Sequence, residues 1–322
     1  MFAMCLDAPG RFINFGDALE YQPISVGVSH RLAERTGVDA LRGLFADPRE
    51  ALKFYDIAKL PVIYRHVAWW DASQPVPAFE QRDYALAESG VVKFTGQTAG
   101  GKPVLLATKA GHNDGHHSHT DVATFILAVD GDSLIPDSGR GHYSKDYFRQ
   151  GRYANAFNNS YTHNVPRIGG QLQAPGPEFG GHQQYHGALV EHGQRDGLKV
   201  AVVEFHDAYD LPALTGARRT LALDAASGAV TLRDDFAFAG NPLAIEEAFV
   251  SWLPVRADGS RARITGPHAA LDLAIVEPEG AVFAVESLEE DCRANDFDET
   301  LHRLAVTLPE GATHFVLRLT PA

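Results

Sequence analysis

The sequence predicts a mainly β protein, in which a large antiparallel β-sandwich is preceded by a few α-helices. Three observations lead to this prediction. Thirty glycines and eighteen prolines among 322 residues indicate many turns. After residue 80, short β-prone runs recur at near-regular spacing, with turn sequences rather than helical periods between them. The residues before position 76 instead carry apolar side chains at helical spacing.

The helical part is expected to hold about three helices. Residues 24–36 repeat an apolar side chain at one-turn spacing, and Gly37 follows as a typical helix stop. A second helix is expected to open at Asp47, with proline at its first helical position, and to end before Pro61. The stretch 71–77, which contains two prolines, then predicts a linker.

We therefore expect two parts, a helical segment over residues 1–75 and a sandwich domain over residues 76–322. Turn dipeptides such as Asp130-Gly131 and Ser227-Gly228 lie between apolar runs and predict hairpins. The expected strands are, in chain order, 90–95, 103–108, 123–129, 134–135, 188–191, 198–205, 219–223, 229–233, 244–253, 261–265, 271–276, 301–308 and 313–319. Many short strands of this kind are typical of an antiparallel sandwich.

The charge and hydropathy patterns exclude two classes of partner. The net charge of −13 argues against a surface for nucleic acid or anionic membranes. No apolar run reaches the ~18 residues that span a bilayer, and the first sixteen residues lack the pattern of a signal peptide. One stretch, 138–167, is nonetheless basic, with Arg140, Lys145, Arg149, Arg152 and Arg167. This patch suits a small or linear anionic ligand, and a solvated basic loop is the alternative.

The densest chemical motif is the segment 111–121, Gly-His-Asn-Asp-Gly-His-His-Ser-His-Thr-Asp. Imidazole and carboxylate groups are the main protein ligands of zinc-type ions, and imidazole is the usual proton carrier near neutral pH. In an extended chain, His117, His119 and Asp121 would point to the same side. The segment is therefore the first candidate for a functional site.

Asp137 and His163, which lie further along the chain, extend this motif into a candidate metal site. Asp137 ends an apolar run, and His163 precedes a short β-prone run. If the strands pair as the hairpin signals indicate, His119 converges with both. Two nitrogens and one oxygen leave a fourth position open, which suits a zinc ion with a bound water. Ordinary hydrogen-bonding roles for the histidines, and a turn-forming role for Asp137, stay open at this point.

Several motifs follow one another in a fixed order. They are His117-Ser118-His119-Thr120-Asp121, Asp137-Ser138-Gly139, the tyrosine- and arginine-rich loop 143–153, His163-Asn164-Val165-Pro166 and the tail 168–173. This order resembles the signature region of the heparinase II/III-like polysaccharide lyases, which include oligoalginate lyases. The stretch 10–17 resembles the part of the family where a helical domain nears its end.

The resemblance implies a fold and a chemistry. The helices would be the end of an incomplete α/α toroid, and the active site would lie in the cleft between toroid and sandwich. The reaction would be β-elimination from a uronic acid. A metal ion, zinc or a similar divalent ion, would be bound by His119, Asp137 and His163, while His117 would act in charge neutralisation or proton transfer.

The resemblance also implies residues that meet the substrate. A tyrosine of the loop 143–153 would serve as acid or base, with Tyr153 as first choice and Tyr147 as second. Binding of the anionic sugar would involve Arg140, Arg152 and Asn164.

Three functions are consistent with these residues. The first is a lyase for alginate-type or glycosaminoglycan-type glycans, for which this chain would be part of a longer enzyme because most of the toroid would lie upstream. The second is a non-catalytic, metal-stabilised sandwich that binds acidic glycans, and the third is a zinc hydrolase that uses an activated water. The expected partner is an acidic polysaccharide or oligosaccharide, with a homodimer left open, and the resemblance favours a periplasmic or secreted protein.

Overall fold

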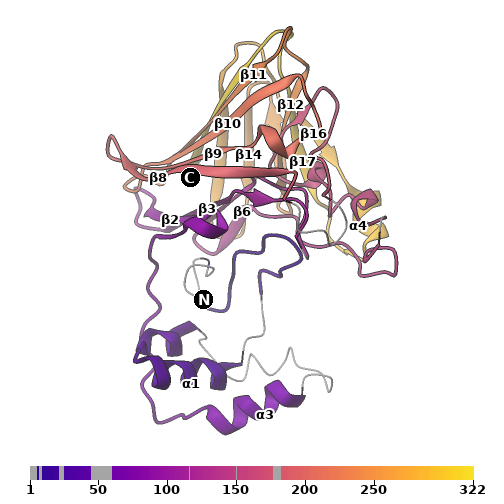
Figure 1. The fold of residues 1–322 in the computed structure, drawn as a ribbon. Coiled ribbons are helices and arrows are strands. Elements are labelled where there is room, and N and C mark those ends of the chain that lie inside the picture. Colours follow the sequence, from indigo (N-terminus) through magenta and orange to yellow (C-terminus); the bar gives the residue numbers. More distant parts are fainter. Residues whose placement is uncertain are drawn as a thin grey trace. The chain divides into compact units, whose positions relative to one another are not determined.

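The computed structural model describes residues 6, 9–21, 25–44, 60–115, 117–149, 151–176 and 183–322 (Figure 1). The chain divides into two compact units. One comprises Met1–Ile13 and Ala18–Arg82, and the other comprises Asn14–Asp17 and Asp83–Ala322. The short segment Asn14–Asp17 therefore belongs with the β-rich unit, although the residues on both sides of it do not.

The first helix of the helical unit, α1 (Val26–Thr36), confirms the helix expected at 24–36. The hydroxyl of Ser25 accepts a hydrogen bond from the Val28 backbone N–H at 3.3 Å and caps the first turn. At the other end Gly37 takes the left-handed conformation, with φ of 71°, and its N–H bonds to the Ala33 carbonyl. A 3₁₀ turn, η2 (Asp39–Leu44), follows. The apolar cluster of this unit consists of Phe12, Val26, Ala33, Leu41 and Leu44.

The second described helix corrects one expectation. Helix α3 spans Leu60–Trp69, so Pro61 lies in its first turn and does not end this helix. Proline fits there because the first turn has no helical partner for its missing N–H. The helix expected to open at Asp47 lies outside the described residues. Residues 71–77 form neither helix nor strand, as the linker prediction requires.

The β-rich unit consists of three antiparallel sheets, and the expected sandwich is confirmed (Figure 1). The five-stranded sheet has, in spatial order, β1 (Tyr84–Leu86), β2 (Val91–Gln97), β3 (Pro103–Lys109), β5 (Phe125–Val129) and β6 (Asp132–Ile135). The nine-stranded sheet has β13 (Val255–Asp258), β14 (Arg261–Thr265), β15 (Ala270–Glu277), β18 (His314–Pro321), β11 (Val230–Phe238), β10 (Leu214–Leu223), β9 (Leu198–Glu204), β8 (His186–Arg195) and β4 (Gly111–His112). The four-stranded sheet has β16 (Ala284–Ser287), β17 (His302–Thr307), β12 (Ile245–Ser251) and β7 (Arg167–Ile168).

The remaining elements of this unit are short. They are the helix α4 (Glu289–Ala294) and the 3₁₀ turns η4 (Ala87–Ser89), η5 (Arg152–Ala154), η6 (Ser160–Thr162) and η7 (His206–Ala208). Loops rather than regular elements carry most of the histidine-rich sequence.

One apolar core joins the three sheets. Leu127 of β5, Leu317 of β18 and Phe249 of β12 belong to a single cluster of buried side chains, and each is fully buried. Burying a side chain of this size contributes roughly 1.5–3 kcal/mol. The core therefore gives the loops at the sheet ends a rigid base.

All thirteen expected strands overlap a strand of the structure. Among the described residues, five strands were not predicted by the sequence, namely β1, β4, β7, β13 and β16, and every one of them is an edge strand of two to four residues. An edge strand has only one neighbour, so it needs few apolar side chains and leaves a weak pattern.

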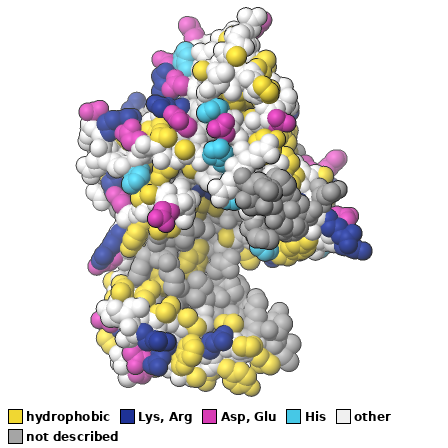
Figure 2. All heavy atoms as spheres, viewed as in Figure 1, with side chains coloured by type: hydrophobic (Ala, Val, Ile, Leu, Met, Phe, Trp, Pro, Cys, Tyr) yellow, Lys and Arg dark blue, Asp and Glu magenta, His cyan; other side chains and the backbone are white. Residues whose placement is uncertain are grey.

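Charged side chains of both signs lie on the surface of the β-rich unit. Lys and Arg lie interspersed with Asp and Glu on the visible face of the β-rich unit, without a broad basic area (Figure 2). None of the helices in the described part of the chain has the length and apolar character that crossing a bilayer requires.

Candidate functional site

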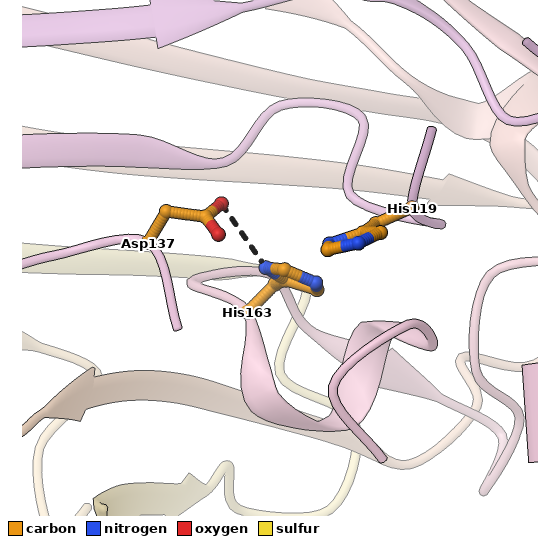
Figure 3. Close-up of side chains that lie close together, drawn as sticks. All are labelled: His119, Asp137 and His163. Atoms are coloured by element: carbon orange, nitrogen blue, oxygen red, sulfur yellow. Dashed lines mark ion pairs between the residues drawn. The ribbon is translucent and has the colours of Figure 1, made fainter. Parts of the chain in front are cut away.

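Three side chains from separate segments converge in the interior of the β-rich unit. His119 lies in the loop between β4 and β5, Asp137 follows the end of β6, and His163 follows η6 (Figure 3). One ligand atom from each lies within 4.8 Å of the others. All three residues are at most 1% exposed. The convergence expected from the sequence is confirmed.

The polar atoms of this group fit a metal ion. Asp137 Oδ1 accepts a hydrogen bond from the Gly139 N–H at 2.9 Å, which leaves Oδ2 facing His163 Nδ1 at 3.2 Å. His119 Nδ1 and His163 Nε2 are buried without a hydrogen-bond partner in the described structure, and the only partners of His163 Nδ1 and Asp137 Oδ2 there are each other, as an ion pair. Buried polar atoms are normally satisfied, so this set is better explained by a cation between them than by packing alone.

Burial and charge act in opposite directions on this group. Burial lowers the pKa of His119, which favours the neutral imidazole that binds metals. Burial also raises the pKa of Asp137 and lowers that of His163, but their mutual attraction outweighs burial. The pKa of Asp137 is therefore lowered and that of His163 raised. Metal binding here would have to displace the proton of this ion pair.

Next to this candidate metal group lies a residue that the sequence did not single out, Asp17. Its carboxylate side chain is 4% exposed. It accepts hydrogen bonds from His117 Nδ1 at 2.7 Å, His119 Nε2 at 2.9 Å, the Tyr143 hydroxyl at 3.0 Å, Arg152 Nη2 at 3.1 Å and the Tyr147 hydroxyl. Asp17 is thus the common partner of five side chains from the predicted site region.

Asp17 is a carboxylate anion. Burial raises its pKa, but the hydrogen bonds from His119, Tyr147 and His117 together hold the pKa well below its ordinary value. The only sequence signal was its place in the stretch 10–17, which resembles the end of the family's helical domain. Nothing local in the sequence shows a contact with residues one hundred positions away.

The loop around His117 is not extended, which corrects one expectation. His117 has φ of 60°, and no strand covers residues 117–121. His117, His119 and Asp121 therefore do not share one face. The ring of His117 is 60% exposed, whereas His119 and Asp121 are fully buried and Asp121 pairs with Lys109 at 2.5 Å. Asp17, not strand geometry, brings His117 and His119 together.

The loop tyrosines are arranged differently from the expected order. The Tyr153 hydroxyl donates to the Asn113 carbonyl at 2.9 Å, and Tyr147 is 2% exposed with its hydroxyl on Asp17. Tyr143 is 38% exposed, and its hydroxyl lies 3.5 Å from His117 Nδ1. Burial is the main cause of a raised pKa in all three tyrosines, so each keeps its proton near neutral pH.

The predicted basic patch is partly neutralised. Arg152 is 4% exposed and binds both Asp17 and the Ser118 carbonyl, and Arg167 pairs with Glu246 at 2.9 Å. The Arg140 guanidinium lies 3.9 Å from the centre of the Tyr143 ring. Arg140 thus stacks on an exposed side chain of the site, and Lys145 and Arg149 are themselves exposed.

Asn164 does not fit its expected role in substrate binding. It is fully buried. Its Nδ2 donates to the carbonyls of Phe125 and Pro136 at 2.8 Å each, and its Oδ1 accepts from the Val250 N–H at 2.8 Å. Asn164 is next in sequence to His163, and both its Nδ2 protons and its Oδ1 are thus engaged with backbone groups of β5, of β12 and of the residue after β6.

Residues 77–309, well over half of the chain, match the family described as Heparinase II/III-like, C-terminal. The chain belongs to the heparinase II/III-like family. It is a family of polysaccharide lyases, and the match covers both the histidine-rich loop and the sheets that support it. Among functionally curated proteins, no sequence matches this chain.

Solved structures share the fold. A heparinase III matches with a TM-score of 0.68 and 12% identity over 100% of this chain and 44% of its own. Heparan sulfate lyase HepC from Pedobacter heparinus matches with a TM-score of 0.67 and 14% identity, over 99% of this chain and 45% of its own. The chain spans less than half the length of these structures, and identities this low establish the fold alone.

Proposed function

We propose that this chain carries part of the active site of a lyase that cleaves uronic-acid polysaccharides or oligosaccharides by β-elimination. The observation that carries the proposal is the joint placement of an exposed histidine, His117, and an exposed tyrosine, Tyr143, above a buried group that can hold a metal. Glycans of the heparan sulfate or alginate type supply the uronic acid that this chemistry requires.

The reaction needs a base and an acid near the same sugar. The proton on C5 is weakly acidic, so its removal depends on a base and on neutralisation of the C6 carboxylate. His117 suits the base because Nδ1 is bound to Asp17, which leaves Nε2 of an exposed ring for the substrate. Removal of the C5 proton forms the double bond between C4 and C5 as the C4–oxygen bond breaks.

A tyrosine suits the acid that protonates the departing oxygen on C4. Tyr153 and Tyr147 were expected in this role, but both hydroxyls are committed inside the protein. Tyr143 is the better candidate, since it is 38% exposed and its hydroxyl lies beside His117 on the Asp17 carboxylate, and its raised pKa keeps the proton on the oxygen. Arg140, stacked on Tyr143, would meet the C6 carboxylate.

The proposed metal is zinc, held by His119, Asp137 and His163. When bound, it would supply a fixed positive charge and cross-link three loops beneath His117. Since all three ligands are buried, the contribution of these residues is to hold the catalytic loop in place, not to touch the sugar.

The test uses the natural polypeptide that contains this chain. Incubation with alginate and with heparan sulfate should raise the ultraviolet absorbance as unsaturated ends form. His117→Ala should lower kcat about 10²–10⁴-fold, as expected for loss of a general base. His192→Ala, an exposed histidine on β8, is the matched control and should leave the rate unchanged.

Two outcomes would replace the proposal. Glycan binding without turnover, unaffected by His117→Ala, would indicate the non-catalytic glycan-binding sandwich. Saturated products, formed only with metal present, would indicate the zinc hydrolase.

A further inference from the structure

The segment Asn14–Asp17 contacts both the candidate metal group and His117. Asn14 Nδ2 donates to the Asp137 carbonyl at 3.4 Å, and the Asp17 N–H donates to the His117 carbonyl at 3.0 Å. Between them Gly16 has φ of 66°, and a Cβ added there would lie 2.5 Å from the His117 carbonyl oxygen. Only glycine permits this approach, so the position of the Asp17 backbone is tightly defined.

The two oxygens of Asp17 are divided between the two histidines. Oδ2 faces Nδ1 of His117 at 2.7 Å, and Oδ1 faces Nε2 of His119 at 2.9 Å. An ionised carboxylate only accepts hydrogen bonds, so each ring nitrogen that faces it carries a proton. In a neutral imidazole the opposite nitrogen then has a free lone pair.

These free lone pairs belong to two different atoms with two different surroundings. On His119 the free atom is Nδ1, which is buried without a hydrogen-bond partner in the described chain and belongs to the ring beside His163 and Asp137. On His117 it is Nε2, on a ring that is 60% exposed. One carboxylate thus sets both tautomers in opposite senses.

We propose that Asp17 is a positioning residue that presents His119 to the metal through Nδ1 and presents His117 to the substrate through Nε2. Carboxylates that accept a hydrogen bond from a metal-bound histidine commonly hold the ring in this manner. The half that concerns His117 rests on the proposed function, whereas the half that concerns His119 is a statement about metal binding alone.

Two further donors keep Asp17 in place. Arg152 binds Asp17 through Nη2 at 3.1 Å and the Ser118 carbonyl at 2.8 Å, and Ser118 lies between the two histidines in sequence. The Tyr147 hydroxyl also donates to Asp17. Arg152 and Tyr147, which were expected to meet the substrate or the reaction, thus act through the carboxylate instead.

The first experiment needs no variant. Long-range ¹H–¹⁵N correlation spectra of the ¹⁵N-histidine-labelled protein, recorded without metal and with zinc, report which ring nitrogens carry protons. We expect the proton of His117 on Nδ1 and that of His119 on Nε2, with zinc perturbing Nδ1 of His119. Zinc bound to Nε2 of His119, or a proton of His117 on Nε2 instead of Nδ1, would overturn the inference.

The second experiment measures zinc affinity by competition with a chromophoric chelator. Asp17→Asn should weaken zinc binding about 10–100-fold, the usual effect of removing such a carboxylate. Asp258→Asn removes the same charge at an exposed position of β13 and should leave affinity unchanged. An affinity of Asp17→Asn within twofold of wild type would overturn the metal half. If Asp17→Asn does not fold, the wild-type spectra still decide, and neither readout depends on lyase activity.

Discussion

The site loops rest on a buried arginine, and its removal should cost several kcal/mol. Arg219, Asp234 and Glu247 are all fully buried. Arg219 binds Asp234 through Nε at 2.9 Å and Nη2 at 2.6 Å, and it reaches Glu247 at 3.2 Å. Burial, and then the neighbouring Asp234, raise the pKa of Glu247 well above its usual range. Arg219 and Asp234 form the main ion pair of this group, with Glu247 as a further neighbour of the guanidinium.

The same guanidinium supports the backbone of the site. Its Nη1 donates to the Ala123 carbonyl at 2.9 Å and to the Asn164 carbonyl, next to the proposed ligand His163. Arg219→Met would leave the Asp234 charge buried without a partner, which costs about 3–5 kcal/mol. We expect that loss in the free energy of unfolding, and weaker zinc binding with it.

The assay is urea unfolding monitored by intrinsic fluorescence, with matched variants. Arg318→Met, at an exposed position of β18, should change stability by less than about 0.5 kcal/mol. Arg219→Met with Asp234→Asn should recover more than about 1 kcal/mol, because the unpaired charge is gone. A loss of less than about 1 kcal/mol for Arg219→Met, or no recovery in the double variant, would refute the reasoning. If Arg219→Met does not fold, Arg219→Lys keeps the charge and should show an intermediate loss.

Two further predictions concern the metal group and an anchor between sheets. Elemental analysis should find about one divalent ion per chain in the wild type and in the control His192→Ala, and none in His163→Ala. An unchanged metal content in His163→Ala would contradict the site. Asp132 accepts hydrogen bonds from the N–H groups of His268 and Ala269 at 2.7 and 2.8 Å, and although burial raises its pKa, these bonds hold the pKa below its ordinary value of 3.8. A depressed pKa stabilises the fold above that value, so Asp132→Asn should lower the free energy of unfolding by about 1.5–3 kcal/mol at neutral pH. The difference from wild type should shrink as the pH falls below 3.8. A difference that does not change with pH would contradict this prediction.

Much of the fold could be predicted from the sequence because its core strands carry local signals. Each interior strand pairs on both sides and must bury apolar side chains, so runs such as 261–265 match β14 residue for residue. The edge strands, with one neighbour each, lack that constraint. Pro61 was misjudged because proline both ends helices and begins them, and the residues before it decide which.

The site was predictable where its residues form motifs and unpredictable where one residue acts at a distance. His119, Asp137 and His163 stand in short patterns with ligand chemistry. Asp17 stands in no such pattern. Its contacts arise because the four residues Asn14–Asp17 belong to the β-rich unit, while their neighbours in sequence belong to the helical unit. The same limit applies to Tyr143 and Tyr147. Their side chains have the same chemistry, and only the fold decides that Tyr147 is buried and Tyr143 exposed.

The most direct test of the central claim is the mass balance of the products from one defined uronate oligosaccharide. β-Elimination adds no water, so the masses of the two products should sum to that of the substrate, and the product bearing the new non-reducing end should be unsaturated. This result should disappear with His117→Ala. Products whose masses sum to the substrate plus one water would show hydrolysis and contradict the account.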